Sequence, residues 1–305
     1  GYTSELDSTL FYGNITPVNK DRKLAITINT YGEDVESVGY KIRSLEDKSL
    51  IENTEVSGYQ VTDNKINVTL NIKNLLDTGK EYALEVVLKT KKHDAVYYYT
   101  RIMYGTDYDL QKKLDFVRDF NACTFDSARL KDIGGYLETS SVGDNTNYGK
   151  VNINCSLSQI GWGDLEPYIE SEITPEIISI NDDVAIIRLD YRVGAANDYS
   201  SSDTYNVNEY YRIRQTNSGF YLLNFEREMN QVFDAKNDLT SSAKINLGIN
   251  SSTYVNCTSD EKGIYTYFVN QGSLWCFSSS SQTFTRVFSF RGEETDSVRE
   301  DYDAH

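Results

Sequence analysis

Apolar and polar side chains alternate with a period of two along the first hundred residues of this 305-residue chain. In KLAITINT, residues 23–30, the large apolar side chains fall on one face, and NKINVTLNI, residues 64–72, repeats the pattern. Such alternation is typical of strands that bury one face. Short turns separate the segments, so the pattern predicts a β-sandwich. Its strands are expected at residues 23–30, 37–45, 64–72, 81–90 and 95–104.

A tyrosine motif sharpens this prediction. In NLLDTGKEYALEVV, residues 74–87, two leucines precede Gly79, and Tyr82 opens an alternating strand. The segment resembles the E–F corner of fibronectin type III domains, where a tyrosine hydroxyl bonds back across the loop. The tryptophan usual on an early strand of such domains is missing here. The resemblance implies a fibronectin-III-like or immunoglobulin-like sandwich over residues 1–106, with Tyr82 making that bond.

The hydrophobic period changes to that of a helix after residue 106. Asp107 is placed to cap the helix N-terminus, and Leu110, Leu114 and Phe120 recur at helical spacing. A second short helix is expected from Phe125, ending at the glycine pair that follows Ile133.

Four further segments then read as strands. They lie at residues 150–157, 176–194 with a turn at 181–183, 205–215 and 219–229. Helices followed by a run of antiparallel strands predict an α+β domain over residues 107–235. This order of elements is similar to that of cystatin-like and nuclear-transport-factor-2-like (NTF2-like) domains.

The last segment, residues 236–305, predicts a β-meander. Its four short strands are expected at residues 252–259, 263–270, 273–280 and 283–290. The runs SLWCFSSS and TFTRVFSF resemble the hairpin strands of a β-propeller blade, and one blade cannot close a ring. The meander is therefore expected to begin a propeller in a longer protein, or alternatively to finish the preceding domain. The acidic tail, residues 291–305, is expected to be a solvated linker or a helix cut short.

The amino-acid composition restricts the classes of partner that the chain can bind. The net charge is −16, with the acidity concentrated in residues 107–235, which disfavours binding to nucleic acid. Tyrosine is unusually common at 24 residues and suits half-exposed strand faces. The modules resemble those of uncharacterised surface or lipoprotein-like proteins of Gram-positive gut bacteria. That resemblance implies an extracellular location at the cell surface, with membrane attachment only through a segment outside this sequence.

Catalysis is not expected. The chain has two histidines, His93 in a predicted turn and His305 at its end, and neither is placed for a histidine-based mechanism or metal ligand. Phosphate-binding glycine motifs are absent from the sequence, so no nucleotide and no other cofactor is expected. We therefore expect a non-catalytic binding or scaffolding module whose partner is an unknown protein or glycan.

One segment supports an alternative function. In WGDLEPYIESE, residues 162–172, Asp164 and Glu166 lie beside Trp162 and Tyr168. Carboxylates beside aromatic rings are what a glycan-binding or glycan-processing cleft requires. An ordinary polar loop with one aromatic packed into the domain would show the same composition.

Four cysteines leave the redox state open. Cys123–Cys155 and Cys257–Cys276 are candidate disulfides, since each pair falls within one predicted domain. Four buried free thiols are the alternative. Their spacings match no zinc motif, so no metal site is expected.

Overall fold

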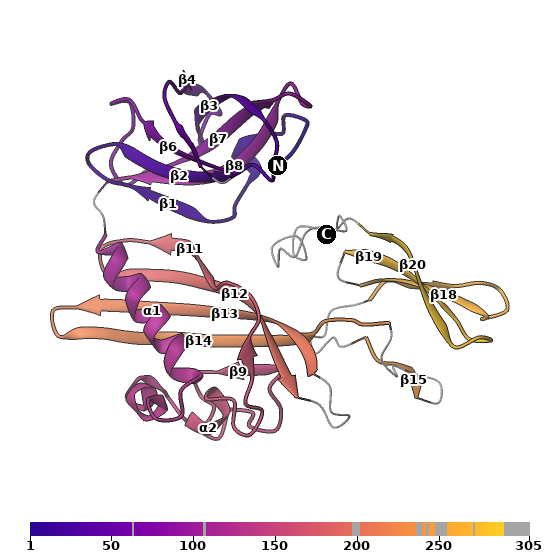
Figure 1. The fold of residues 1–305 in the computed structure, drawn as a ribbon. Coiled ribbons are helices and arrows are strands. Elements are labelled where there is room, and N and C mark those ends of the chain that lie inside the picture. The colour runs from indigo at the N-terminus through magenta and orange to yellow at the C-terminus, as the bar shows by residue number, and fades with distance from the viewer. Residues whose placement is uncertain are drawn as a thin grey trace. The chain divides into compact units, whose positions relative to one another are not determined.

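The computed structural model describes residues 1–62, 64–105, 108–196, 202–235, 240–241, 244–247, 255–270 and 272–289 (Figure 1). The chain is mainly β and divides into two compact units. The first unit holds Gly1–Lys113 and Glu176–Ile186, and the second holds Leu114–Pro175 and Ile187–His305. The predicted domain boundary after residue 106 lies outside the described residues, and the boundary after residue 235 lies where the described range 202–235 ends. The division into three domains stays a prediction.

The N-terminal region forms two sheets that face each other across one core. The larger sheet has the order β1-β8-β7-β3-β4, and the smaller has the order β2-β6-β5. Its strands are β1 (Ile15–Val18), β2 (Lys23–Asn29), β3 (Val35–Ser44), β4 (Leu50–Glu55), β5 (Gln60–Thr62), β6 (Lys65–Asn71), β7 (Glu81–Thr90) and β8 (Val96–Tyr104). All five predicted strands are confirmed, and the arrangement is compatible with an immunoglobulin-like or fibronectin-III-like fold.

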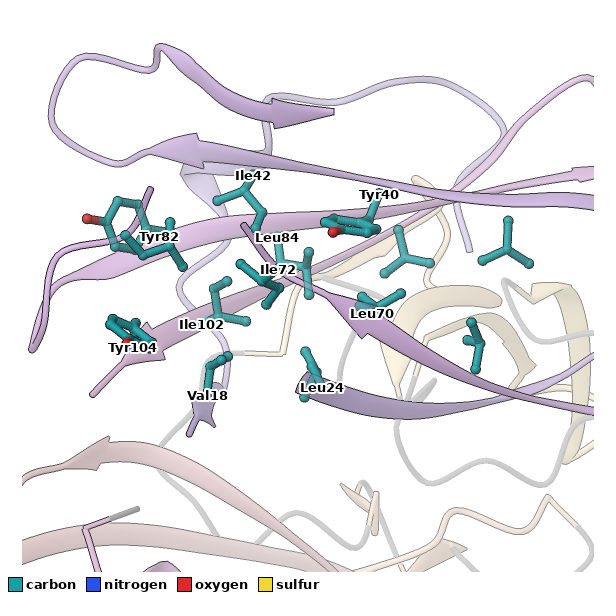
Figure 2. Close-up of a cluster of buried hydrophobic side chains, with 14 of the residues drawn as sticks. Val18, Leu24, Tyr40, Ile42, Leu70, Ile72, Tyr82, Leu84, Ile102 and Tyr104 are labelled. Carbon is teal, nitrogen blue, oxygen red and sulfur yellow. The ribbon is translucent and has the colours of Figure 1, made fainter. Parts of the chain in front are cut away.

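The core lies where the alternating pattern places it (Figure 2). Ile42 from β3, Leu70 from β6 and Ile102 from β8 are 0% exposed, and they come from both sheets. In β6 the pattern alternates without exception between buried and exposed residues. Burial of each such side chain contributes about 1.5–3 kcal/mol, so in an alternating strand such as β6 the apolar residues determine which face points inward.

Two tyrosine hydroxyls satisfy polar groups at the edge of this core. The Tyr82 hydroxyl accepts the Asp77 backbone N–H at 2.8 Å, which is the bond predicted across the E–F corner. The Tyr40 hydroxyl donates to the buried carboxylate of Glu52 at 2.6 Å. Burial, and then the hydrogen bond to Glu52, raise the pKa of Tyr40, so it remains a donor.

The middle region combines helices with a long antiparallel sheet. Its strands follow the order β10-β12-β13-β14-β9, and β11 also pairs with β12. The elements are α1 (Leu110–Thr124), the 3-10 helix η2 (Leu130–Tyr136), β9 (Lys150–Asn152), α2 (Leu157–Ile160), β10 (Tyr168–Ile169), β11 (Thr174–Ile180), β12 (Val184–Ala196), β13 (Ser202–Thr216) and β14 (Gly219–Gln231). Phe120 of α1 packs on this sheet, with ring centroids 5.6 Å from Tyr211 and 5.4 Å from Phe225.

The sequence pattern overestimates the length of strand β9. Residues 150–157 were expected to be extended, but β9 ends at Asn152. The Asn152 side chain accepts the Asn154 backbone N–H at 3.0 Å, which closes a turn on the strand. Ser156 then caps α2 by accepting the Gln159 N–H at 3.2 Å. Local hydrogen bonds from polar side chains therefore override the apolar alternation.

The C-terminal region contains a four-stranded antiparallel meander in sequence order. Its strands are β17 (Cys257–Ser259), β18 (Tyr265–Asn270), β19 (Ser273–Ser278) and β20 (Thr283–Ser289), and a short pair, β15 (Thr240–Ser241) and β16 (Lys244–Ile245), precedes them. Phe233, which follows β14, packs edge-on against Trp275, with ring centroids 4.9 Å apart. The meander is as predicted, its likeness to a propeller blade stays a prediction, and residues 291–305 lie outside the described residues.

We expect Tyr82→Phe to lower the free energy of unfolding by about 1 kcal/mol, because it removes the acceptor for the Asp77 N–H. Urea unfolding of the full chain measures this. The matched control is Tyr12→Phe, at a tyrosine that is 72% exposed, where a change within about 0.5 kcal/mol is expected. Equal effects of the two substitutions would contradict a stabilising role for the corner bond.

Candidate functional site

The acidic and aromatic segment, residues 162–172, is split between core and surface. Trp162 is 1% exposed, whereas Tyr168 in β10 is 51% exposed. Asp164 and Glu166 are also exposed, and Asp164 accepts a hydrogen bond from the Tyr148 hydroxyl at 3.1 Å. Trp162 therefore offers no ring face to a sugar, and the four residues do not share one surface. A polar loop with one aromatic packed into the domain describes the segment, and ligand binding by its exposed residues stays a prediction.

Trp162 instead packs against a buried arginine of the sheet. The Arg227 guanidinium carbon lies 3.4 Å from the centre of the Trp162 ring. A cation over an aromatic face is attracted by the ring quadrupole, most strongly where water is excluded. The indole N–H donates to the Thr124 hydroxyl oxygen at 3.3 Å. Trp162 thus connects α1 to β14.

Arg227 also closes the end of α2. Its two terminal nitrogens donate to the carbonyl oxygens of Ile160 at 2.9 Å and Gln159 at 3.0 Å. The last carbonyls of a helix have no partner within the helix, and Arg227 supplies one to Ile160. The Gln159 carbonyl also accepts the Trp162 backbone N–H at 3.3 Å. Burial lowers the pKa of Arg227, because desolvation disfavours the charged form.

Glu209 supplies the opposite charge. It stands directly across from Arg227 in the register of β13 and β14, and its Oε1 lies 3.9 Å from a guanidinium nitrogen. Its Oε2 accepts from the Tyr211 hydroxyl at 2.6 Å and from the Asn121 amide at 2.8 Å. Burial, followed by the charge of Glu209, raises the pKa of both Tyr191 and Tyr211 well above the ordinary value. Both phenols therefore remain protonated.

We call these side chains the interior network: Asn121, Trp162, Tyr191, Glu209, Tyr211 and Arg227. All six are at most 4% exposed, so they are enclosed by protein. A buried ion pair is strongly destabilised when one partner is removed, because the other charge is left uncompensated. The network therefore stabilises the fold of the middle region, and only the other face of the sheet is open to a ligand.

The outward face of β13 and β14 carries a second set of polar residues. Side chains alternate across a strand, so the neighbours of Glu209 and Arg227 point away from the interior. The register pairs Asn208 with Glu228, Tyr210 with Glu226, and Arg212 with Asn224. Five of these residues line an open hollow of about 360 Å³, and we call them the outer ladder: Asn208, Tyr210, Asn224, Glu226 and Glu228.

The outer ladder is half-buried and partly held by its own hydrogen bonds. The Asn224 amide donates to a Glu226 carboxylate oxygen at 3.0 Å, and the Asn208 amide donates to Asp190 of β12. Glu228 lies 3.4 Å from the ammonium of Lys150. These contacts orient amide and carboxylate groups around the hollow before any ligand is present.

A bulge lies at one end of the ladder. The register of β13 and β14 shifts between Arg212 and Ile213, so Leu223 has no partner directly across from it. A bulge increases local twist and re-aims neighbouring side chains. It stands next to Asn224, which lines the hollow.

Reasoning from the sequence missed this ladder. The run YNVNEYYRIRQ, residues 205–215, does show Asn208 and Tyr210 at alternate positions, which assigns them to one face. The residues across from them follow from the register of β14, and the bulge shifts that register by one residue. The sequence signal therefore finds half of the site.

The N-terminal sandwich carries a second open hollow, of about 420 Å³. Its lining residues are Ser57, Gly58, Tyr59, Gln60, Asn67, Thr69 and Asn71. All of these residues are uncharged, and the side chains supplied by β6 are exposed. The hollow is thus the ordinary polar outer face of a sandwich strand, and it provides a comparison for the outer ladder.

All four cysteines are free thiols in the structure, so neither candidate disulfide is present. Cys257 pairs with Phe268 across one edge of β18, and Cys276 pairs with Tyr267 across the other. Two strand spacings, roughly 9–10 Å, therefore separate them, which exceeds the reach of a disulfide. The Cys155 thiol is engaged locally, accepting the Asn152 N–H at 3.4 Å.

Among the described residues, no group of three or more His, Cys, Asp or Glu side chains is placed to hold a metal ion. The helices in the described part of the chain are too short or too polar to cross a membrane.

The fold of the chain belongs to the mainly β class, with several sheets and few helices. A scan against models of known protein families finds no match, and a search of curated proteins finds no relative.

We expect Arg227→Met to destabilise the middle region by about 3–5 kcal/mol, because it leaves the Glu209 carboxylate buried without a counter-charge. Adding Glu209→Gln to Arg227→Met should recover part of this loss. Urea unfolding followed by Trp162 fluorescence, in a Trp275→Phe background, isolates the signal of this region. Additive losses in the double variant would show that the two charges do not interact.

We expect four alkylated cysteines when the protein is denatured without a reductant and treated with iodoacetamide, as counted by mass spectrometry. In the folded protein Cys257 should react first, because it is exposed. Cys123 should react only on opening, since it is 1% exposed and burial raises its pKa, which lowers the thiolate fraction. Fewer than four labels in the denatured sample would show that a disulfide exists.

Proposed function

We propose that this chain is a non-catalytic binding module of a bacterial surface protein, acting outside the cytoplasm. The proposal is carried by the difference between the two faces of strands β13 and β14. One face holds the enclosed interior network, and the other holds the outer ladder around an open hollow. A rigid sheet that presents oriented polar groups to solvent suits binding, because little conformational freedom remains to be lost.

The domain likenesses support a modular surface protein. The Tyr82–Asp77 bond and the two-sheet topology fit a fibronectin-III-like or immunoglobulin-like domain over residues 1–106. A helix packed on a long antiparallel sheet fits a cystatin-like or NTF2-like domain over residues 107–235. The four-stranded meander fits a propeller-like unit over residues 236–305. We assign the binding role to the second of these domains.

We expect the full chain to co-sediment with isolated cell envelopes of a Gram-positive bacterium and to release no reducing sugar from them. A folded acidic protein of similar size serves as the control for nonspecific retention. Binding follows from the outer ladder, and the lack of turnover follows from a site used for recognition. Gel densitometry of the pellet and a reducing-sugar assay of the supernatant provide the two readouts.

Two results would overturn this proposal. Retention no greater than that of the control protein would show that the chain does not bind the envelope. Release of reducing ends at a rate that rises with protein concentration would show catalysis, and the glycan-processing alternative would replace binding as the function.

A further inference from the structure

We propose that the outer ladder binds a neutral oligosaccharide, with Glu226 and Asn208 accepting from sugar hydroxyls at the centre of the site. This inference rests on the proposed binding function and names its ligand class. The proposed binding site is the hollow formed by β13 and β14, which is lined by amide, carboxylate and phenol groups.

The chemistry of the lining matches sugar hydroxyls. Each hydroxyl of a sugar ring both donates and accepts, and a neighbouring pair of hydroxyls needs acceptors and donors close together. The carboxylates of Glu226 and Glu228 accept only, and amides such as that of Asn224 do both. Bonds to ionised groups are about twice as strong as neutral ones, so the carboxylates provide the stronger contacts.

The groups are held in place, yet they keep capacity for a ligand. Asn208 commits its amide nitrogen to Asp190, which fixes the direction of its carbonyl oxygen. Asn224 commits its amide to one oxygen of Glu226, and a carboxylate oxygen accepts more than one bond. The Tyr210 hydroxyl makes no hydrogen bond to another described residue, and Tyr210 is paired with Glu226 in the register of the two strands. Because these side chains are already held in place, they lose less conformational entropy when a ligand binds.

The dimensions favour an oligosaccharide over a single sugar. Outward residues on one strand repeat about every 7 Å, so the three ladder residues of β14 span roughly 14 Å. The hollow is open and shallow, as a site for an internal stretch of a chain should be. A site for one monosaccharide would instead enclose most of the ligand surface.

Charge and composition disfavour the main competing ligands. Glu226 repels anionic ligands such as uronic acid chains, whereas the charge of Glu228 is partly balanced by Lys150. Protein interfaces are enriched in aromatic residues, Met and Arg at their centre and are depleted of Glu. The hollow has two glutamates and one tyrosine, so a neutral glycan fits its lining better than a protein partner does.

The test compares the 305-residue chain with its variants on an array of neutral and acidic oligosaccharides. Isothermal titration then measures affinity for the best neutral ligand. Glu226→Gln keeps the size of the side chain but removes the charge, and binding should weaken about tenfold. Asn208→Ala should weaken it by a similar factor. The matched control is Asn67→Ala in the sandwich hollow, which should bind like the unmodified chain.

Folding is checked independently, because Glu226 and Asn208 are half-buried. Each variant should unfold in urea at a midpoint close to that of the unmodified chain. If Asn208→Ala proves unstable, Glu226→Gln and Tyr210→Phe carry the test, since both keep the shape of the side chain.

Four outcomes would overturn the inference. The first is that the chain is retained on protease-treated envelopes but binds no neutral glycan on the array. The second is that envelope binding is lost after protease treatment. Either result would indicate another envelope component as the ligand and leave the binding function intact. Preference for acidic glycans would overturn the neutral class. Loss of binding in Asn67→Ala, with full binding in the ladder variants, would move the site to the sandwich.

Discussion

The pairing of Arg227 with Glu209 across β13 and β14 is the constraint on which the middle region depends. Both side chains are 0% exposed and stand directly opposite each other. A slip of one residue would send Arg227 into solvent and bring Glu226 or Glu228 into the apolar interior. An unpaired charge in that position costs several kcal/mol, so the register is specified by electrostatics as well as by apolar burial.

The outer ladder is a consequence of this register. Because side chains alternate, fixing Glu209 and Arg227 inward fixes Tyr210 and Glu226 outward and opposite each other. The two faces are therefore coupled through the backbone without sharing a contact. A mutation that weakens the interior network would also disturb the geometry of the outer hollow, even though the mutated residue contacts none of the residues that line the hollow.

Much of the fold could be predicted from the sequence, since alternation reports burial directly. The sandwich strands, the long helix α1 and the strands β11–β14 all follow from period, and Tyr82 makes the bond that its motif indicates. Hydrophobic periodicity cannot predict a position at which a charged residue is buried on the apolar face of a strand. Glu209 occupies an apolar face between Val207 and Tyr211, and its tolerance there requires a partner 18 positions later in the chain.

The burial of Trp162, a residue of the binding segment predicted from the sequence, was harder to predict, for a different physical reason. Trp162 lies in a segment with no period, and its backbone adopts a left-handed conformation with φ of +67°. Its position depends on Arg227, which lies 65 positions later in the chain and contacts both the Trp162 ring and the end of α2. Composition identified an acidic aromatic stretch correctly, but composition carries no information on which side chain faces the core.

The openness of the outer hollow determines how such a site could work. A few exposed hydrogen bonds contribute about 0.5–1.5 kcal/mol each after exchange with water, and binding must also offset lost motional freedom. A single site of this kind is therefore weak, and its half-buried, pre-oriented side chains reduce that loss without removing it. Repeated ligands and several linked modules raise the effective affinity by orders of magnitude, provided that the spacing permits simultaneous contact. A repetitive glycan surface supplies such spacing, which is the physical reason that a shallow site on a rigid sheet suits a modular surface protein.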